Sequence, residues 1–167
     1  RTFSSAASDV YKRQGNYNSN TSKFYTDLGL LSTDPEIASD LLELFNYLSG
    51  FSKQKNYQKL LVSPSSMRKK FIFLIKREIK NAEEGKKAEI IAKMNSLVDP
   101  EIINLLYLAS DSGVKISLIV RGICCLYPQR KNLSENIKVK SIIGHFLEHS
   151  RIFWFCNNGD NEVFIGS

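Results

Sequence analysis

Arg121 ends an apolar segment and is well suited to binding an anion. It follows Leu118-Ile119-Val120 and precedes Gly122. Arginine carries a permanent charge and a planar set of donors, so its place at the mouth of a sheet favours a phosphate or carboxylate ligand. Gly122 permits a ligand to approach the backbone closely. The alternative is a surface ion pair with Asp99 or Glu135, which the spacing alone leaves open.

His149 and Arg151 form a second candidate pair. They stand two residues apart in Leu147-Glu148-His149-Ser150-Arg151, so in an extended chain their side chains lie on the same side. An imidazole and a guanidinium placed in this way can hold one phosphate group. The alternative is a structural or an exposed position, which is the more common role of a lone histidine beside an apolar strand. We expect His145 to pack against its neighbours or to face solvent.

The strands that carry these residues predict where the side chains meet. In an open α/β sheet, ligands bind beyond the carboxyl ends of the strands. Three predicted strands end there in polar residues: Lys93-Met94-Asn95, Arg121-Gly122 and Ser63-Pro64. The alternation along residues 114–121 puts Arg121 on the face away from the apolar side chains. We expect Asn95 and Arg121 to meet at this edge, with Lys93, Asn95 and Arg151 as further candidates for phosphate contacts.

The pattern of apolar residues predicts alternating helices and strands. A helix should begin at Pro35, with Thr33 or Asp34 as its cap, and end before Gly50. Residues 51–59 are polar and aromatic and indicate a connector. The elements expected after it are a strand at 60–62, a helix at 66–84, a strand at 88–94, a helix at 100–112 capped by Asp99, and strands at 114–120, 137–143, 151–156 and 162–165. This order predicts an α/β fold whose sheet is built with crossover connections.

Composition limits the classes of protein that remain. The chain has 167 residues, 43% of them hydrophobic, and a formal net charge of +6, which favours anionic partners only weakly. No apolar run is long enough to span a membrane. Cys124, Cys125 and Cys156 lie in apolar patterns, which indicates reduced thiols, and without a Cys-x-x-Cys or a histidine cluster we expect no zinc. The basic face of the helix at 66–84 is typical of a solvated surface.

Longer strings of the sequence resemble a known family. Asn16-Tyr17, Tyr25-Thr26-Asp27, Ala92-Lys93-Met94-Asn95-Ser96-Leu97-Val98-Asp99 and the segments around Arg121 and His149 are similar to the C-terminal part of bacterial polyphosphate kinases, in register from about Gly15 to Ser167. The resemblance implies an α/β, phospholipase D-like fold, with a mixed, largely parallel sheet flanked by helices and preceded by the tail of a second similar domain.

The same resemblance divides the chain into three parts. Residues 15–59 would be the end of the first phospholipase D-like domain, and residues 60–167 a second such domain, truncated at its C-terminus. Residues 1–14 show no clear apolar period, begin without a methionine and resemble translated sequencing-adapter sequence. We therefore leave residues 1–14 out of the expected fold as a non-native segment.

Family membership would also assign an activity. Polyphosphate kinases transfer the terminal phosphate of ATP reversibly to inorganic polyphosphate, through a phosphohistidine and with Mg²⁺. The resemblance implies that Tyr25, Arg121 and His149 bind ATP, with His149 in a supporting catalytic role. The phosphohistidine belongs to a His-Ala-Lys string upstream of Gly15, and the sequence contains no such string. We therefore expect neither the nucleophile nor metal ligands in this chain, and no activity from the chain alone.

Partners and location follow from the same resemblance. ATP, ADP and inorganic polyphosphate are the expected partners, with no nucleic acid and no transmembrane segment. The resemblance places the parent enzyme in the cytoplasm and leaves open both association with a membrane complex and a homo-oligomeric state. In that enzyme we expect Tyr25, Arg121 and His149 to converge around one pocket at the junction of the two domains, with Tyr25 crossing from the first.

Two other classes of function remain open from the residues alone. A phospholipase D-like phosphodiesterase would use a His-x-Lys pattern, whereas this chain has His149-Ser150-Arg151 and lacks a second such half. A non-enzymatic polyanion-binding module would fit the net charge, but the sequence has neither a glycine-rich phosphate loop nor an aromatic platform of the RNA-binding type.

Overall fold

The structure is a computed structural model that describes residues 10–14, 19–20, 22–26, 28–51, 56–64 and 66–166. The described residues form two compact units. The first unit takes its residues from 1–13 and 29–70, and the second from 14–28 and 71–167.

The first unit combines a two-stranded sheet with one helix. Strand β1 (Val10–Gln14) pairs with β3 (Leu28–Ser32). Helix α1 (Pro35–Leu48) begins where the sequence predicts, because the Asp34 carboxylate accepts hydrogen bonds from the backbone N–H groups of Glu36 at 2.8 Å and Ile37 at 3.4 Å. The proline in the first turn needs no such partner, since it has no N–H to satisfy.

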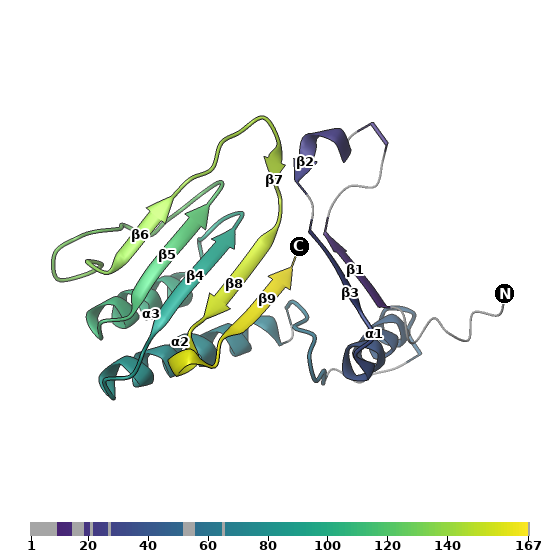
Figure 1. Ribbon diagram of the computed structural model, residues 1–167, viewed down its shortest axis with the longest axis horizontal. Helices are drawn as coiled ribbons and strands as arrows, with labels where there is room; N and C mark the ends of the chain where they lie inside the picture. The colour runs from purple at the N-terminus through teal and green to yellow at the C-terminus, as the bar shows by residue number, and fades with distance from the viewer. Residues whose placement is uncertain are drawn as a thin grey trace. The chain divides into compact units, whose positions relative to one another are not determined.

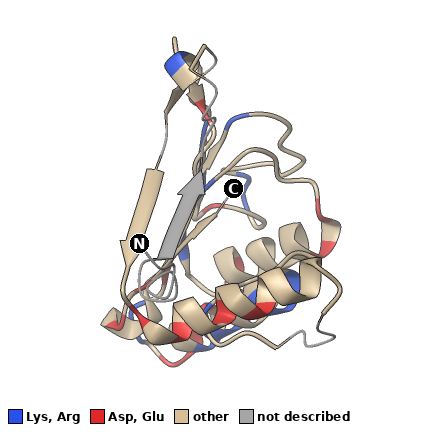
Figure 2. Cartoon of the chain, turned by 90° about the vertical axis from the view of Figure 1, so that its right-hand side faces the viewer, with Lys and Arg blue, Asp and Glu red and all other residues tan. Residues whose placement is uncertain are grey.

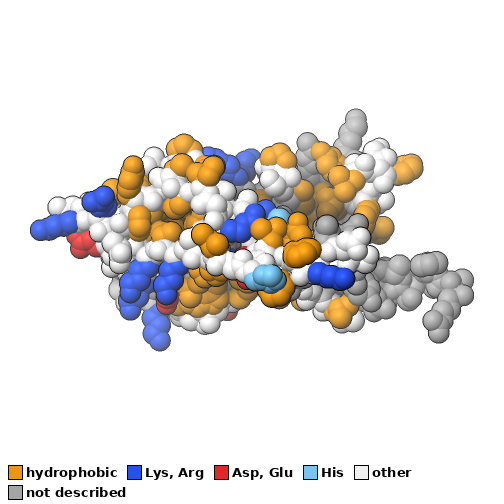
Figure 3. Space-filling model, turned by 90° about the horizontal axis from the view of Figure 1, so that it is seen from above, with side chains coloured by type: hydrophobic (Ala, Val, Ile, Leu, Met, Phe, Trp, Pro, Cys, Tyr) orange, Lys and Arg blue, Asp and Glu red, His pale blue; other side chains and the backbone are white. Residues whose placement is uncertain are grey.

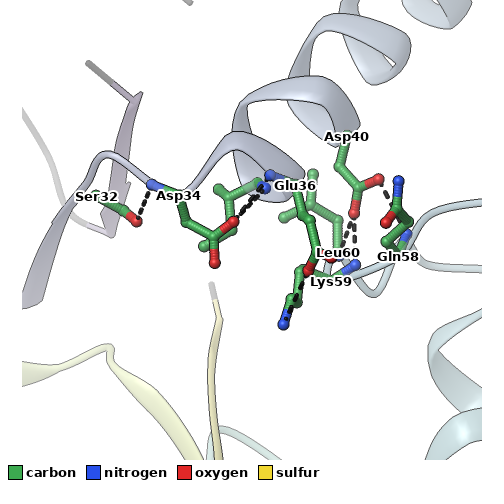
Figure 4. A network of polar contacts seen from close by, with 8 residues as sticks. Ser32, Asp34, Glu36, Asp40, Gln58, Lys59 and Leu60 are labelled. Atoms are coloured by element: carbon green, nitrogen blue, oxygen red, sulfur yellow. Dashed lines mark hydrogen bonds and ion pairs between the residues drawn. The ribbon is translucent and has the colours of Figure 1, made fainter. Parts of the chain in front are cut away.

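Asp40 of α1 fastens the segment that follows the helix. Its side chain is buried, and its two oxygens accept hydrogen bonds from the backbone N–H groups of Gln58 (2.9 Å), Lys59 (2.6 Å) and Leu60 (2.8 Å) (Figure 4). Burial alone would raise the pKa of this carboxyl, but the three backbone donors outweigh it and hold the pKa below its ordinary value. One ionised side chain thereby orders residues 58–60.

Two expectations about this part of the chain are wrong. Residues 60–62 form no strand, although all three are half-buried. An apolar run becomes a strand only when a neighbouring strand accepts its backbone hydrogen bonds. Residues 10–14, which we left out of the fold, form β1, and β3 beside it was not predicted from the sequence.

A five-stranded sheet dominates the second unit. Its strands are β4 (Glu89–Met94), β5 (Lys115–Val120), β6 (Ile137–Lys140), β8 (Arg151–Phe155) and β9 (Glu162–Gly166), in the order β6-β5-β4-β8-β9. The pairs β4–β5 and β5–β6 are parallel, whereas β8 is antiparallel to both β4 and β9. All strands except β8 therefore point the same way, and the sheet is mixed and largely parallel, as expected (Figure 1).

Helices α2 (Met67–Glu83) and α3 (Pro100–Asp111) lie on one face of this sheet (Figure 1). Asp99 caps α3, as predicted, by accepting from the N–H groups of Glu101 and Ile102. One core joins helices and strands through apolar residues that include Leu74 and Ile75 of α2, Leu106 and Ala109 of α3, Ile90 and Ala92 of β4, and Ile116, Leu118 and Val120 of β5. The residues between these on the strands, such as Ile91 and Lys93, point to the other face.

Glu78 of α2 is a buried carboxylate that joins three parts of the second unit. One oxygen accepts from the N–H of Asn157 at 3.0 Å, and the other from the N–H of Glu89 at 3.3 Å. Arg77 lies 3.5 Å from Glu78 and forms a 2.7 Å ion pair with Glu162 of β9. Burial raises the pKa of Glu78, although these hydrogen bonds and the Arg77 charge oppose the shift.

Short elements complete the second unit. A 3₁₀ turn, η2 (Ser22–Phe24), leads into β2 (Tyr25–Thr26), and η3 (Asn157–Gly159) connects β8 to β9. Strand β2 pairs in parallel with β7 (Leu147–Glu148), Tyr25 opposite Leu147 and Thr26 opposite Glu148. Neither two-residue strand was predicted, yet their pairing brings Tyr25 beside the segment that contains His149.

Charge and cysteine usage agree with the sequence analysis. Helices α1 and α3 carry Asp and Glu but no Lys or Arg, whereas α2 carries both signs with the basic residues in excess (Figure 2). Cys124, Cys125 and Cys156 are free thiols. Among the residues that the structure describes, no helix is long and apolar enough to cross a membrane.

Candidate functional site

The register of the sheet places the candidate residues at one edge. Lys93 of β4 lies opposite Ile119 of β5 and Ile152 of β8. Because β8 runs antiparallel to β4, the residues just before β8 lie beside those just after β4 and β5. Asn95, Arg121 and Ser150, each two residues beyond that row, therefore meet at the carboxyl edge of the parallel strands. Ligands bind at this edge in open α/β sheets.

Asn95 and Gly122 are in direct backbone contact there. The N–H of Arg121 donates to the carbonyl oxygen of Met94 at 3.1 Å, and the N–H of Gly122 to that of Asn95 at 2.7 Å. A Cβ atom on residue 122 would lie 3.1 Å from the Asn95 carbonyl oxygen and 3.3 Å from the Ser96 hydroxyl. The expected meeting of Asn95 and the Arg121-Gly122 pair is thus present in the backbone, and a side chain at position 122 would be crowded there.

The charge of Arg121 has no carboxylate partner among the described residues. Its Nη1 donates a long hydrogen bond of 3.5 Å to the backbone oxygen of Glu148, the residue before His149. The surface ion pair with Asp99 or Glu135 that the sequence left open does not form. A half-buried guanidinium held by one long hydrogen bond keeps donors for an anion.

Lys93 forms an ion pair with Glu148 and a hydrogen bond with Ser150. Its Nζ lies 2.6 Å from Oε2 of Glu148 and 2.6 Å from Oγ of Ser150, and its side chain is only 16% exposed. The hydrogen bond from Lys93 is the largest influence on the pKa of Glu148 and lowers it, with the charge of Lys93 and a hydrogen bond from Thr26 adding to the effect. The ammonium expected to contact phosphate therefore binds the two residues that flank His149.

Tyr25 and His149 pack ring against ring. Their centroids are 6.0 Å apart and their planes cross at 75°, an edge-to-face arrangement. The pairing of β2 with β7 brings them together, and the Thr26 hydroxyl donates to the Leu147 carbonyl oxygen at 3.4 Å. Tyr25 belongs to the same compact unit as His149 and Arg121, and the expectation that it comes from the first domain stays a prediction.

The remaining candidates take different positions. Arg151 is the first residue of β8, half-buried and opposite Gly166 of β9. His145 is exposed and its ring packs against Phe146, with centroids 5.1 Å apart, as expected. Viewed from above in Figure 3, histidine side chains lie beside Lys and Arg side chains and among apolar ones. The edge thus joins positive charge to an imidazole and a tyrosine hydroxyl, a combination suited to a polyphosphorylated ligand.

Comparison with known protein families gives this arrangement an identity. The domain family described as polyphosphate kinase C-terminal domain 2 matches residues 60–167, and that described as polyphosphate kinase C-terminal domain 1 matches residues 6–54. The first match alone covers more than half of the chain. The chain belongs to the polyphosphate kinase family.

Individual polyphosphate kinases agree with this assignment. That of Prochlorococcus marinus is 63% identical over 158 residues, covering 95% of this chain and 22% of the relative. That of Dictyostelium discoideum is 53% identical over 153 residues, covering 92% of this chain and 14% of the relative. The chain therefore spans about a fifth, or less, of the length of the curated polyphosphate kinases that it matches, and it corresponds to their C-terminal part.

A solved structure agrees with the fold as well. The crystal structure of polyphosphate kinase from Porphyromonas gingivalis matches with a TM-score of 0.86 and 41% identity, over 94% of this chain and 26% of that one. The predicted phospholipase D-like α/β fold is thereby confirmed as the fold of a polyphosphate kinase C-terminal region.

Three residues of this polyphosphate kinase edge were missed by the sequence analysis. Glu148 and Ser150 received no role, and Thr26 was quoted only as part of a string. The sequence contains one indication that Glu148 and Ser150 share a partner: they are two residues apart, so their side chains lie on the same side of an extended chain. Their partner Lys93 is 55 residues away from Glu148 and could not be inferred without the register of β8 against β4.

A metal site is a separate question for a polyphosphate kinase. Within the described residues there is no group of three or more His, Cys, Asp or Glu side chains that could hold a metal ion. Mg²⁺ prefers several oxygen ligands in octahedral geometry.

Proposed function

We propose that this chain forms the part of a polyphosphate kinase that binds the triphosphate of ATP during reversible transfer of its terminal phosphate to inorganic polyphosphate. The observation that carries the proposal is the convergence of Arg121, Tyr25 and His149 at the carboxyl edge of the sheet. Family membership supports the reaction, and the open donors of Arg121 support the ligand. ATP, ADP and polyphosphate are its proposed partners.

Arg121 would neutralise charge on the phosphates. Phosphoryl transfer depends mainly on positioning the reactants and on stabilising charge spread over the oxygens of the transferring group. The guanidinium can donate two parallel hydrogen bonds to phosphate oxygens. It enters the site from the end of a rigid strand, which limits its freedom before the ligand binds.

Tyr25 and His149 would complete the cradle. The phenol donates a hydrogen bond to a phosphate oxygen, and its edge-to-face contact with the imidazole fixes the orientation of both rings. His149 can donate a hydrogen bond or a proton to an oxygen on which charge develops. Asn95 and Arg151 are proposed as further phosphate contacts.

The nucleophile and the metal are proposed to come from elsewhere. The chain contains two histidines, His145 and His149, and neither begins a His-Ala-Lys string. We propose that the phosphate-accepting histidine belongs to another part of the enzyme, and that Mg²⁺ arrives with ATP as the counter-ion of its phosphates. A cytoplasmic location, association with a membrane complex and a homo-oligomeric parent stay predictions.

A domain boundary near residue 59 is part of the same proposal. Residues 15–59 would close the first phospholipase D-like domain and residues 60–167 would form the second, in line with family matches that divide between residues 54 and 60. The family match that begins at residue 6 and strand β1 support a first domain that begins before residue 15.

A full-length enzyme that carries this sequence tests the proposed function. Incubation with labelled ATP should yield polyphosphate, and with ADP and polyphosphate it should yield ATP. Arg121→Ala should lower kcat/KM for ATP by about a hundredfold or more, because it removes the charge as well as the donors. An unsubstituted enzyme that transfers no phosphate would contradict the function, and an Arg121→Ala enzyme of normal kcat/KM would contradict the site.

A further inference from the structure

The ammonium of Lys93 is bound by side chains of the protein, whereas a phosphate-binding lysine would keep its donors for the ligand. Its ammonium lies 2.6 Å from a carboxylate oxygen of Glu148 and 2.6 Å from the hydroxyl of Ser150. Those two residues stand immediately before and after His149. A single cation therefore holds both neighbours of the proposed catalytic imidazole.

The geometry points to Lys93 as a positioning residue: we propose that it fixes the backbone at His149 through Glu148 and Ser150, and that it does not contact the phosphates of ATP. This inference rests on the proposed function, because it assigns Lys93 a task in the same site. It adds Glu148 and Ser150 to the residues on which phosphoryl transfer depends.

Bridging residues 148 and 150 restricts residue 149. In an extended chain, side chains two apart share one side and the residue between them points the opposite way. When Lys93 draws Glu148 and Ser150 together, the imidazole of His149 is therefore directed away from the ammonium. Its ring lies instead against Tyr25, with centroids 6.0 Å apart.

Other contacts hold the same short segment from two further sides. Nη1 of Arg121 bonds the backbone oxygen of Glu148 at 3.5 Å, and β2 pairs with β7 at Leu147 and Glu148. These contacts act on the backbone before His149, whereas Lys93 is the contact that reaches across to Ser150 behind it. Without Lys93, Ser150 would lose this contact, and the segment after the histidine would be held only from Arg151 onward, where β8 pairs with β9.

The ion pair between Lys93 and Glu148 is stable at neutral pH. The carboxylate of Glu148 is 24% exposed and stands next to His149. The ammonium of Lys93 neutralises that charge at 2.6 Å. The hydrogen bond from Lys93 also lowers the pKa of Glu148, so the carboxylate stays ionised and the pair stays intact at neutral pH.

A double-mutant cycle in the full-length enzyme separates positioning from phosphate contact. Lys93→Met and Glu148→Gln should each lower kcat by about tenfold or more with KM for ATP changed by less than about threefold, since a displaced catalytic group affects the chemical step. If Lys93 acts through Glu148, the kcat of the double variant should lie within about threefold of the kcat of the less active single variant. Ser150→Ala should reduce kcat in the same way, and it covers the case in which Lys93→Met fails to fold.

Lys140→Met is the matched control. Lys140 of β6 lies opposite Ile119, which lies opposite Lys93, so both lysines share one row and one face of the sheet. Lys140 is exposed and its removal changes the net charge equally. Its loss should leave kcat and KM unchanged, which shows that the effect of Lys93 is local.

The possible results distinguish failure of the positioning role from failure of the proposed function. A raised KM with normal kcat in Lys93→Met, losses that multiply in the double variant, or an equal loss in Lys140→Met would overturn the positioning role. An inactive unsubstituted enzyme would overturn the proposed function and the positioning role with it. An active enzyme with additive losses would overturn the positioning role alone.

Discussion

Arg121 offers two properties that substitution can separate, its charge and its planar set of donors. Arg121→Lys keeps the charge and removes the planar donor set, so it should cost about 1–3 kcal/mol of binding in the transition state. That loss corresponds to a roughly ten- to hundredfold fall in kcat/KM for ATP. The melting temperature should change little, because the 3.5 Å bond to Glu148 is the protein contact that would be lost. Steady-state kinetics and thermal unfolding of the full-length enzyme measure both.

The opposite results have clear meanings. A surface arginine contributes about 0–1 kcal/mol, so as a structural residue it should alter kcat/KM by less than about threefold. A variant that keeps full activity defeats the assignment of Arg121 as a phosphate ligand. One that melts early while kcat/KM stays normal reveals a role in the fold.

Gly122 tests the close approach of the strand ends. Gly122→Ala puts a Cβ atom 3.1 Å from the Asn95 carbonyl oxygen, a contact that the backbone can relieve only by moving. Overpacking of this kind costs about 1–3 kcal/mol of stability. Denaturant unfolding should show that loss, and kcat/KM for ATP should fall because Arg121 moves with the strand end. Gly29→Ala, where no atom lies within 4 Å of the added Cβ, is the comparison that should be unaffected.

At the scale of elements, Asp40 connects helix α1 to residues 58–60. The pKa of Asp40 is lowered in the folded protein. Its stabilising effect is therefore complete above the unfolded pKa, about 3.9, and is lost as the pH falls through the folded pKa. Asp40→Asn should destabilise the protein at neutral pH by about 1–3 kcal/mol, because an amide cannot accept from all three backbone N–H groups.

Acid titration of stability makes that prediction specific. Below pH 4 the difference between the unsubstituted protein and Asp40→Asn should shrink, since protonation removes the same acceptor. Urea unfolding at pH 7, 5 and 3 measures it. Asp111→Asn, at an exposed position near the end of α3, should show no such convergence. A constant difference across the three pH values would show that Asp40 is not the titrating group.

Glu78 should respond to pH in the opposite sense. Its pKa is raised by burial, so its contribution to stability is complete below the unfolded pKa, about 4.3, and declines as the pH rises through the folded pKa. Glu78→Gln removes that decline, yet it also leaves one of the two backbone N–H groups without an acceptor, at a cost of about 1–3 kcal/mol. Urea unfolding between pH 4 and pH 7 should therefore show a flatter pH dependence for Glu78→Gln. An unchanged slope would count against a raised pKa.

Elements set by neighbouring residues could be predicted from the sequence, and elements set by distant partners could not. Asp34-Pro35 and Asp99-Pro100 each carry a cap and a first turn within a few residues, so both helix starts were found. The apolar run at 60–62 resembles a strand locally but has no ladder partner. The direction of β8 also depends on residues far along the chain, and it determines that Ser150 lies beside Lys93.

The candidate site divides in the same way. Arg121 could be placed at a strand end and on the correct face, because alternation needs only the strand that carries it. Lys93 was assigned to phosphate because its sequence neighbours say nothing about Glu148. Tyr25 and His149 were linked through a family resemblance, whereas the physical reason for their contact, the pairing of β2 with β7, lies in strands too short to show a period.

At the scale of the molecule, we expect binding without turnover from this chain alone. The sequence has no His-Ala-Lys string, so incubation with labelled ATP should give neither polyphosphate nor an acid-labile phosphate on His145 or His149. Acid-sensitive phosphate analysis after the incubation measures the second product. Acid-labile label on either histidine would show that the nucleophile is within this chain.

The pairing of β2 with β7 joins residues 121 positions apart, as in the hydrogen bond from Thr26 to Leu147. Closing a loop of that length in a flexible chain costs on the order of 4 kcal/mol of entropy. Two paired residues offer too few hydrogen bonds to offset it, so the pair must form late, after the sheet has shortened the loop. During synthesis Tyr25 leaves the ribosome long before its partner exists. Amide hydrogens of β2 should then exchange with solvent sooner than those of β4 and β5, because the last contact to form is also the first to open.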